Sequence, residues 1–186
     1  MSNSILSGKK ILVAVSGSIA AVKAPILVSR LVKTGAEVRC VITQSASKLV
    51  SPLSLSTLSR NKCYQDNDQW NVSQSKPLHI ALAEWAELII VAPMSATSLS
   101  KFTSGNADGL LSSILLAAQS QIVIAAAMNT SMWSNQSVMK NWNHVKTIEQ
   151  VISLEPCEGL LACDRFGDGK MANLDIIELA SESAFI

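Results

Sequence analysis

Apolar residues along this chain form short continuous runs, and longer stretches between them carry apolar side chains at helical spacing. The runs that predict β-strands are KILVAVS (10–16), EVRCVIT (37–43), ELIIVAP (87–93) and QIVIAAA (121–127). They are mostly apolar throughout, whereas a strand with one face in water alternates between apolar and polar residues. The pattern therefore favours a parallel sheet that is covered on both faces.

The stretches between and after these runs predict helices over 19–33, 79–86, 107–118, 136–146 and 174–185. Strand and helix alternate, which predicts right-handed crossovers and a Rossmann-like or flavodoxin-like, doubly wound α/β fold with helices on both faces of the sheet. Pro25 is expected to kink the first helix. The one long polar segment, 60–77, is expected to be functional or mobile. We expect a single domain over residues 1–186.

Composition and charge narrow the possible partners. The 186 residues are 48% hydrophobic and 16% charged, and the formal net charge is +1. This balance lacks the basic excess that nucleic acid or an anionic membrane surface attracts. After Lys9 and Lys10 only about five apolar residues precede Ser16, too few for a signal-peptide core or a membrane span. The sequence predicts a cytoplasmic protein that binds neither nucleic acid nor membrane.

The four cysteines, Cys40, Cys63, Cys157 and Cys163, form no Cys-x-x-Cys pair and have no histidine at metal-binding spacing. We therefore expect no metal site and no disulfide framework. Cys40 lies inside a predicted strand and is expected to be a core residue. Cys163 alone lies among loop residues.

Small polar residues follow each predicted strand: SGS (16–18), TQS (43–45), PMSATS (93–98) and AMNTSMW (127–133). Open α/β sheets bind ligands at the carboxyl edge, where these segments should meet. Backbone amides at the helix start after Gly17 and Ser18 would suit a phosphate. The segment is neither a Walker loop nor a GxGxxG motif.

Each candidate residue also has a structural interpretation. His79 could cap a helix or lie on the surface, and Asn129 could cap the helix that follows it. Met132 could belong to the core, and Cys163 could be a buried loop residue. Taken separately, these residues identify no reaction.

Their order along the chain carries a resemblance. The segments are SGSIAAVKAP (16–25), HIALAEWAELIIVAPMSATS (79–98), GNADGLL (105–111), AAAMNTSMW (125–133) and GLLACDRFGDGKM (159–171). Over essentially its whole length the sequence resembles the flavin-dependent cysteine decarboxylases, and most closely their phosphopantothenoylcysteine decarboxylase branch. Four departures stand out: Ala126 replaces a usual proline, Thr97 an asparagine, Asp164 a glycine and Lys170 an arginine.

The resemblance implies a reaction. FMN oxidises the cysteine moiety of 4'-phosphopantothenoylcysteine to a thioaldehyde, carbon dioxide leaves, and the remaining enethiolate is reduced to 4'-phosphopantetheine. His79 would be the acid/base residue of the decarboxylation. Cys163 would donate the proton in the final reduction, on a loop that Gly167 and Gly169 allow to close over substrate.

The resemblance also assigns binding residues. The substrate would be held by Asn129, Met132, Ala162 and Lys170. The residues expected to bind FMN are Gly17, Ser18, Ile19, Thr43, Ser45, Ser95, Ala96, Thr97, Ser98, Ala127 and Met128.

The family is also oligomeric, which implies a trimer or trimer-based assembly with FMN at a subunit interface. We expect no ligase domain in this chain, and a separate phosphopantothenate–cysteine ligase in the pathway. Three other functions stay open: a peptidyl-cysteine decarboxylase, a flavin prenyltransferase and a non-catalytic regulatory flavoprotein.

Overall fold

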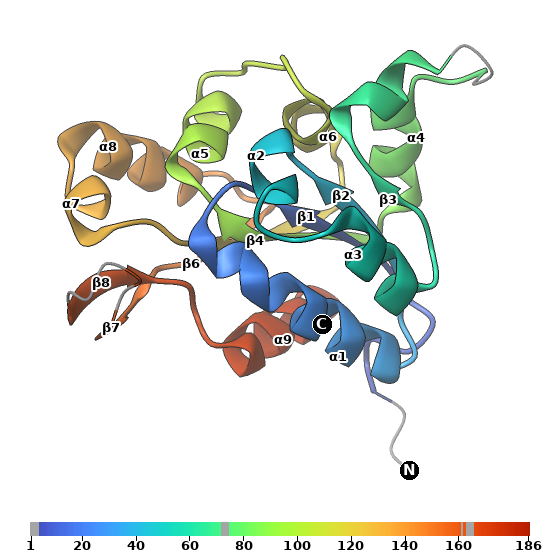
Figure 1. Ribbon diagram of the computed structural model, residues 1–186, viewed down its shortest axis with the longest axis horizontal. Coiled ribbons are helices and arrows are strands. Elements are labelled where there is room, and N and C mark those ends of the chain that lie inside the picture. The colour runs from blue at the N-terminus through green and yellow to red at the C-terminus, as the bar shows by residue number, and fades with distance from the viewer. Residues whose placement is uncertain (1–3, 72–74, 161, 163–165) are drawn as a thin grey trace.

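The computed structural model describes residues 4–71, 75–160, 162 and 166–186. Its centre is a parallel six-stranded sheet in the order β3-β2-β1-β4-β5-β6 (Figure 1). The strands are β1 (Lys10–Val15), β2 (Glu37–Ile42), β3 (Cys63–Tyr64), β4 (Leu88–Met94), β5 (Gln121–Ala126) and β6 (Val151–Leu154). This is a Rossmann-like order, which confirms the predicted fold class.

Helices cover both faces of the sheet. One face packs against α1 (Ala24–Lys33), α3 (Pro52–Ser59) and α9 (Leu174–Ser183). The other packs against α4 (Leu78–Trp85), α5 (Ala96–Thr103), α6 (Leu110–Ala117) and α8 (Gln136–Val145). The shorter elements are η1 (Ile19–Lys23), α2 (Gln44–Ser47), η2 (Asp66–Trp70), α7 (Thr130–Trp133) and the antiparallel hairpin β7 (Cys157–Leu160) and β8 (Phe166–Lys170). Every described helix is too short or too polar to cross a bilayer.

Alternate residues of each central strand enter two separate cores. In β1, Ile11 and Val13 belong to the core under α1 and α9, whereas Leu12 and Ala14 belong to the core under α4 and α6. All four side chains are fully buried. Both faces of the strand are apolar for this reason, as the continuous apolar runs predicted.

Pro25 has a different effect from the one expected. The segment 19–33 is a 3-10 helix, η1, followed directly by α1, and the proline lies in the first turn of α1. Proline has no N–H to donate, and the first turn of an α-helix needs none. Pro25 therefore helps to start α1 and does not kink a continuous helix.

The topology places the switch point between β1 and β4. The chain passes from β1 toward β2 on one side, and from β4 toward β5 on the other. Connections that diverge in this way leave a crevice at the carboxyl ends of the two central strands. The hairpin β7–β8 lies beside α7, below it in Figure 1.

Candidate functional site at the switch point

Ser16 joins the ends of the two central strands. Its side chain is fully buried, and its Oγ donates to the carbonyl oxygen of Pro93 at 2.8 Å and accepts from the backbone N–H of Ser95 at 2.7 Å. The Ser95 hydroxyl in turn accepts from the N–H of Ser98 and caps α5. The start of α5 is thereby fixed relative to the end of β1.

Three helical segments begin at this edge, one after each of β1, β2 and β4. Ser18 caps η1, Thr43 caps α2 and Ser95 caps α5, each through its side-chain oxygen. The turns after β1 and β2 lie so close that a Cβ on Gly17 would be 2.5 Å from the Cβ of Ser45. The close approach therefore requires glycine at position 17.

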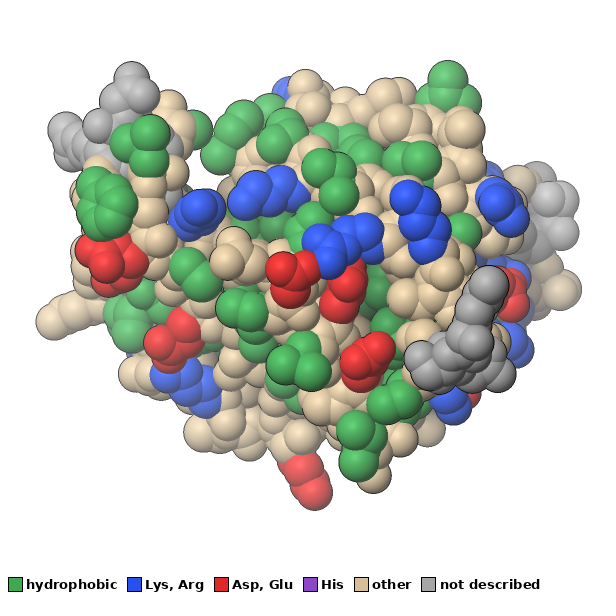
Figure 2. Space-filling view, turned by 90° about the horizontal axis from the view of Figure 1, so that it is seen from below, with side chains coloured by type: hydrophobic (Ala, Val, Ile, Leu, Met, Phe, Trp, Pro, Cys, Tyr) green, Lys and Arg blue, Asp and Glu red, His purple; other side chains and the backbone are tan. Residues whose placement is uncertain are grey.

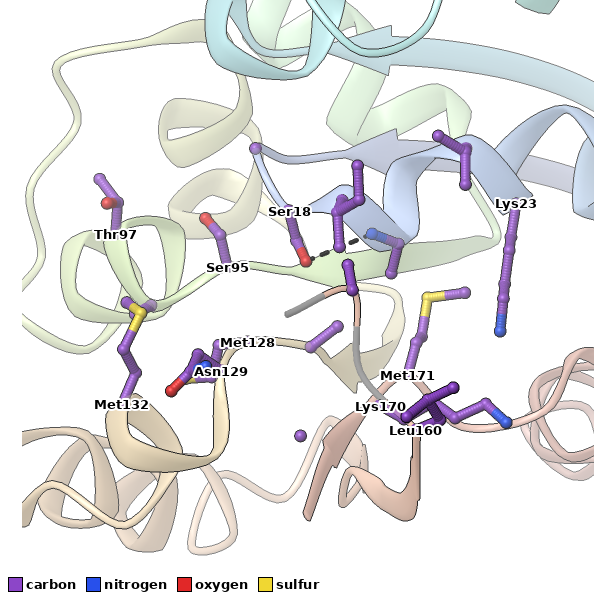
Figure 3. Close-up of a pocket in the computed structure, with 18 residues that line it drawn as sticks. Ser18, Lys23, Ser95, Thr97, Met128, Asn129, Met132, Leu160, Lys170 and Met171 are labelled. Atoms are coloured by element: carbon purple, nitrogen blue, oxygen red, sulfur yellow. Dashed lines mark hydrogen bonds between the residues drawn. The ribbon is translucent and has the colours of Figure 1, made fainter. Parts of the chain in front are cut away.

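Two adjoining cavities open along this edge and share Gly17, Ser95 and Thr97. The larger has a volume of about 490 Å³, within the range of about 300–1,000 Å³ typical of small-molecule and cofactor sites. Figure 3 shows its residues, which come from the ends of β1, β4 and β5 and from the hairpin. Most of the lining side chains are apolar.

The smaller cavity, of about 180 Å³, is more polar. Its hydroxyl side chains are those of Thr43, Ser45, Ser95, Thr97, Ser98 and Ser112. Two charged residues also line it, Asp66 and Lys101. The Asp66 carboxylate accepts from the N–H of Leu110 at 2.8 Å, and Lys101 forms an ion pair with Asp108 at 2.8 Å. Clustered hydroxyls at the starts of two helical segments favour an anion or a polyhydroxylated chain.

The hairpin rests on the loop after β5. The N–H of Met128 donates to the carbonyl oxygen of Gly169 at 3.0 Å. Gly169 has φ +146°, and a Cβ there would lie 2.2 Å from the carbonyl oxygen of Met128. This contact requires glycine, and it brings Leu160, Ala162 and Lys170 into the lining of the larger cavity.

Asn129 combines its two possible roles. Its side-chain oxygen accepts from the N–H of Ser131 at 2.9 Å and so caps α7, while the residue also lines the larger cavity. Met132, one turn further on, lines the same cavity and is 48% exposed. Trp133 instead packs edge-on against the buried Trp142, with ring centroids 5.2 Å apart. Helix α7 thus presents Met132 to the cavity and Trp133 to the core.

The structure brings most of the predicted site residues together. Those in the larger cavity are Gly17, Ser18, Ile19, Ser95, Ala96, Thr97, Ala127, Met128, Asn129, Met132, Ala162 and Lys170. Thr43, Ser45 and Ser98 line the smaller cavity. The roles assigned to these residues stay predictions.

His79 lies outside both cavities. His79 is half-buried in the first turn of α4, which packs against α6 and η2, and it lines neither cavity. Helices α4 and α7 lie at opposite sides of Figure 1. Cys163 and Asp164 lie outside the described residues.

The sequence interpretation missed several cavity residues. Lys23, Leu160 and Met171 line the larger cavity, and Asp66 and Lys101 the smaller. The position of Asp66 inside the polar segment 60–77 was a usable signal, because such segments tend to be functional. Lys23 lies inside SGSIAAVKAP (16–25), one of the segments that carry the resemblance, but the resemblance gave it no role.

Two other cysteines belong to the core. Cys40 on β2 is the register partner of Cys63 on β3, and both are buried. Burial raises the pKa of the Cys40 thiol far above its ordinary value and raises the pKa of Cys63 to about 12. Both therefore stay protonated at neutral pH and unreactive. Among the described residues no group of three His, Cys, Asp or Glu side chains could hold a metal ion.

The Rossmann-like sheet and the cavity at its switch point place the chain among the doubly wound α/β proteins, a class that binds ligands in this crevice. Residues 2–183 match the model of the Flavoprotein family, and the chain belongs to this family. The family found is the one that the sequence segments resembled.

Two curated relatives extend the comparison. The chain is 39% identical over 181 residues to the Coenzyme A biosynthesis bifunctional protein CoaBC of Bacillus subtilis, with 97% of this chain and 44% of that protein covered. This chain thus spans less than half the length of that relative. It is 38% identical over 175 residues to the probable phosphopantothenoylcysteine decarboxylase of Streptococcus mutans, with 91% of this chain and 94% of that protein covered.

Solved structures share the fold at similar identity. A PPC decarboxylase with a cysteine-to-serine mutation, complexed with pantothenoylaminoethenethiol, matches with a TM-score of 0.86 and 33% identity, covering 95% of this chain and 97% of that one. The FMN binding protein AtHal3 matches with a TM-score of 0.83 and 33% identity, covering 94% and 95%.

Proposed function

We propose that the protein is an FMN-dependent decarboxylase that converts 4'-phosphopantothenoylcysteine to 4'-phosphopantetheine, a step of coenzyme A biosynthesis. The observation that carries the proposal is that one cavity at the switch point gathers the predicted phosphate turn, Asn129 and the hairpin. The similarity to the Streptococcus mutans relative over 94% of that protein supports the same reaction.

The residues of the two cavities fit FMN. The glycine-dependent approach of Gly17 to Ser45 leaves backbone and hydroxyl groups around the smaller cavity, where a phosphate and a ribityl chain would bind. The larger, mainly apolar cavity adjoins it through Ser95 and Thr97 and suits a flat aromatic ring. When bound, FMN supplies the two-electron oxidation of the thiol-bearing carbon and the later return of a hydride.

The chain itself positions the substrate. Asn129 is oriented by its cap on α7, and the amide nitrogen of its side chain is the kind of donor that a carboxylate accepts. An uncharged donor holds the carboxylate without stabilising it so strongly that loss of carbon dioxide slows. Met132 and Ala162 would pack against the cysteine moiety and exclude water.

Two residues move protons in this proposal. Cys163 donates the proton that accompanies the return of the hydride, to the carbon of the enethiolate from which carbon dioxide left, and His79 is the acid/base residue of the decarboxylation. Because His79 lines neither cavity of its own chain, we propose that a neighbouring copy supplies it, in a homotrimer or an assembly of trimers.

Exposed apolar side chains beside the larger cavity support such an assembly. Ile19, Val22 and Ile26 project from η1 and α1, and Leu160 and Phe166 from the hairpin; all five are more than half exposed. A cluster of large apolar residues around a cavity is a common feature of an interface between chains.

Subunit mixing tests the shared site. A His79→Asn variant and an Asn129→Ala variant should each lose turnover while FMN stays bound. If one site combines His79 of one chain with Asn129 of another, mixed oligomers formed by refolding the two together should recover part of the activity. Full inactivity of mixtures shown to contain both variants would place the two residues in one chain's site.

The central experiment is mass spectrometry of the product after anaerobic incubation of the FMN-loaded protein with 4'-phosphopantothenoylcysteine. Loss of carbon dioxide alone supports the proposal. Loss of carbon dioxide and two further hydrogens would instead favour a product of the peptidyl-cysteine decarboxylase type. Unchanged substrate would refute the proposal and favour a regulatory role.

A Cys163→Ser variant separates the two halves of the reaction. It should release carbon dioxide and stop at the oxidised enethiol, since reduction of the enethiolate needs a proton as well as the returned hydride. A saturated product from this variant would remove the role given to Cys163. In the pathway proposed here, a separate ligase supplies the substrate and both reactions take place in the cytoplasm.

A further inference from the structure

Two lysines line the larger cavity without a counter-charge. Lys23 ends η1, Lys170 ends β8, and both are half-buried. No Asp or Glu is among the described residues that line this cavity, and within the described chain neither lysine forms an ion pair or a hydrogen bond. Within the described part of the chain, the cavity therefore carries two positive charges that no carboxylate balances.

Neighbouring cations are neutralised. Arg30, on α1, forms ion pairs with Asp175 and Glu178 of α9, and Lys101 at the smaller cavity pairs with Asp108. On the face shown in Figure 2, basic side chains form a row, and acidic side chains adjoin only part of it. Within the described chain other lysines, Lys33 and Lys48 among them, also form no ion pair, but these line neither cavity. Lys23 and Lys170 differ from them in lying at the larger cavity.

Two lysines that line one mainly apolar cavity, with no Asp or Glu among the described lining residues, favour a ligand of opposite charge. An anion bound there would accept charge-assisted hydrogen bonds from the ammonium groups. The arrangement points to a ligand with a negatively charged group.

The two lysines lie apart from the residues that would bind the cofactor phosphate and the substrate carboxylate. Figure 3 shows Lys23 and Lys170 at one side of the cavity, and Thr97, Asn129 and Met132 at the other. In the proposed function the cofactor phosphate occupies the hydroxyl-rich smaller cavity, and the substrate carboxylate lies at Asn129. The lysines therefore serve a third anionic group. Leu160 and Met171, which line the same side, offer an apolar surface to the chain that carries it.

We infer that Lys23 and Lys170 form a subsite for the terminal phosphomonoester of the substrate and select phosphorylated substrate over its unphosphorylated form. The inference rests on the proposed function and adds a specificity determinant to it. A lysine contacts a phosphate as a point charge, so the subsite tolerates some variation in the angle at which the phosphate enters.

The test compares two substrates, 4'-phosphopantothenoylcysteine and pantothenoylcysteine, in the FMN-loaded protein. Lys23→Met and Lys170→Met should each lower kcat/KM for the phosphorylated substrate about tenfold, the size expected for one partly exposed charge-assisted contact. They should lower kcat/KM for the unphosphorylated substrate much less, so that the ratio of the two kcat/KM values falls. Lys33→Met, at the exposed lysine that ends α1 and lines neither cavity, is the matched control and should alter neither value.

Equal losses on both substrates, or no loss, would overturn the inference. FMN titrations of the same variants distinguish the two possible phosphates: weaker FMN binding with unchanged substrate preference would assign the lysines to the cofactor and overturn the subsite.

If the wild-type protein decarboxylates neither substrate, the proposed function fails. The subsite is then tested by calorimetric titration with 4'-phosphopantetheine and pantetheine. Tighter binding of the phosphorylated compound that disappears in the Lys23→Met/Lys170→Met double variant supports the subsite, and equal affinities refute it.

Discussion

Removal of one hydroxyl, in Ser16→Ala, should destabilise the switch point far more than its size suggests. The change deletes the hydrogen bonds to the Pro93 carbonyl and from the Ser95 N–H. The Pro93 oxygen keeps a second donor, the N–H of Ser16 at 3.3 Å, so its loss is limited to about 1 kcal/mol. The buried Ser95 N–H loses the partner described for it, which costs about 1–3 kcal/mol.

The expected decrease in the free energy of unfolding is therefore about 2–4 kcal/mol, measured by urea denaturation of the cofactor-free protein. Ser181→Ala is the control, because Ser181 is also fully buried but its hydroxyl only donates to the Ile177 carbonyl within α9. That variant should lose less than about 1 kcal/mol. Equal losses in the two variants would refute the reasoning that Ser16 joins the central strands.

FMN affinity gives a second measurement on the same variants. Ser95 begins α5 and lines both cavities, so a displaced Ser95 should weaken FMN binding in Ser16→Ala. Ser181 lines neither cavity, and its variant should bind FMN as the wild type does. Unchanged FMN affinity in Ser16→Ala would show that the hydrogen bonds of the Ser16 hydroxyl to Pro93 and Ser95 stabilise the fold but do not shape the cofactor site.

Three further predictions concern close contacts and titration. Gly169→Ala should displace the hairpin and abolish turnover, because the added Cβ would lie 2.2 Å from the carbonyl oxygen of Met128. Gly105→Ala is the control: Gly105 has φ +69°, but no atom lies within 4 Å of the added Cβ. That variant should lose only about 1 kcal/mol of stability and keep its turnover. Gly17→Ala should weaken FMN binding in a fluorescence titration, because the added Cβ would clash with the Cβ of Ser45. A second change, Ser45→Gly, removes that Cβ and should restore part of the FMN affinity. If the double variant recovers no affinity, the clash is not the cause of the loss. The pKa of the Cys63 thiol is about 12 in the folded protein and about 8.5 in the unfolded chain. The contribution of this thiol to the free energy of unfolding is therefore fully present below about pH 8.5 and is lost as the pH rises toward 12. Urea titrations above about pH 9 should show a steeper fall in stability for the wild type than for Cys63→Ala.

The central strands were predictable because their burial is uniform. Each of the four apolar runs begins and ends within one residue of an observed strand. In β1, β4 and β5 every middle position is apolar and buried because helices cover both faces, whereas β2 carries the partly buried Arg39. Strand β6 and the hairpin were not predicted. Val151–Leu154 is only half-buried, and Phe166–Lys170 contains two glycines, so neither has a strong apolar pattern.

The candidate site was predictable where it follows the strands. Ser18, Ser95 and Asn129 follow β1, β4 and β5, and the topology alone brings those strand ends to one edge. Lys23 and Asp66 reach the cavities through the packing of η1 and η2, which no pattern of apolar residues encodes. The position of His79 away from both cavities also depends on how α4 packs.

The bridge at Ser16 spans 79 residues of sequence, and the contact between Met128 and Gly169 spans 41. A ligand at the switch point therefore binds only a chain whose sheet has already assembled, because no contiguous segment holds the whole binding surface. By mass action, a cofactor present at about 100 times its dissociation constant would add about 2.7 kcal/mol to the folded state of the entire domain. By the proposal that this cofactor is FMN, flavin depletion would remove that stabilisation and raise the unfolded fraction of the protein.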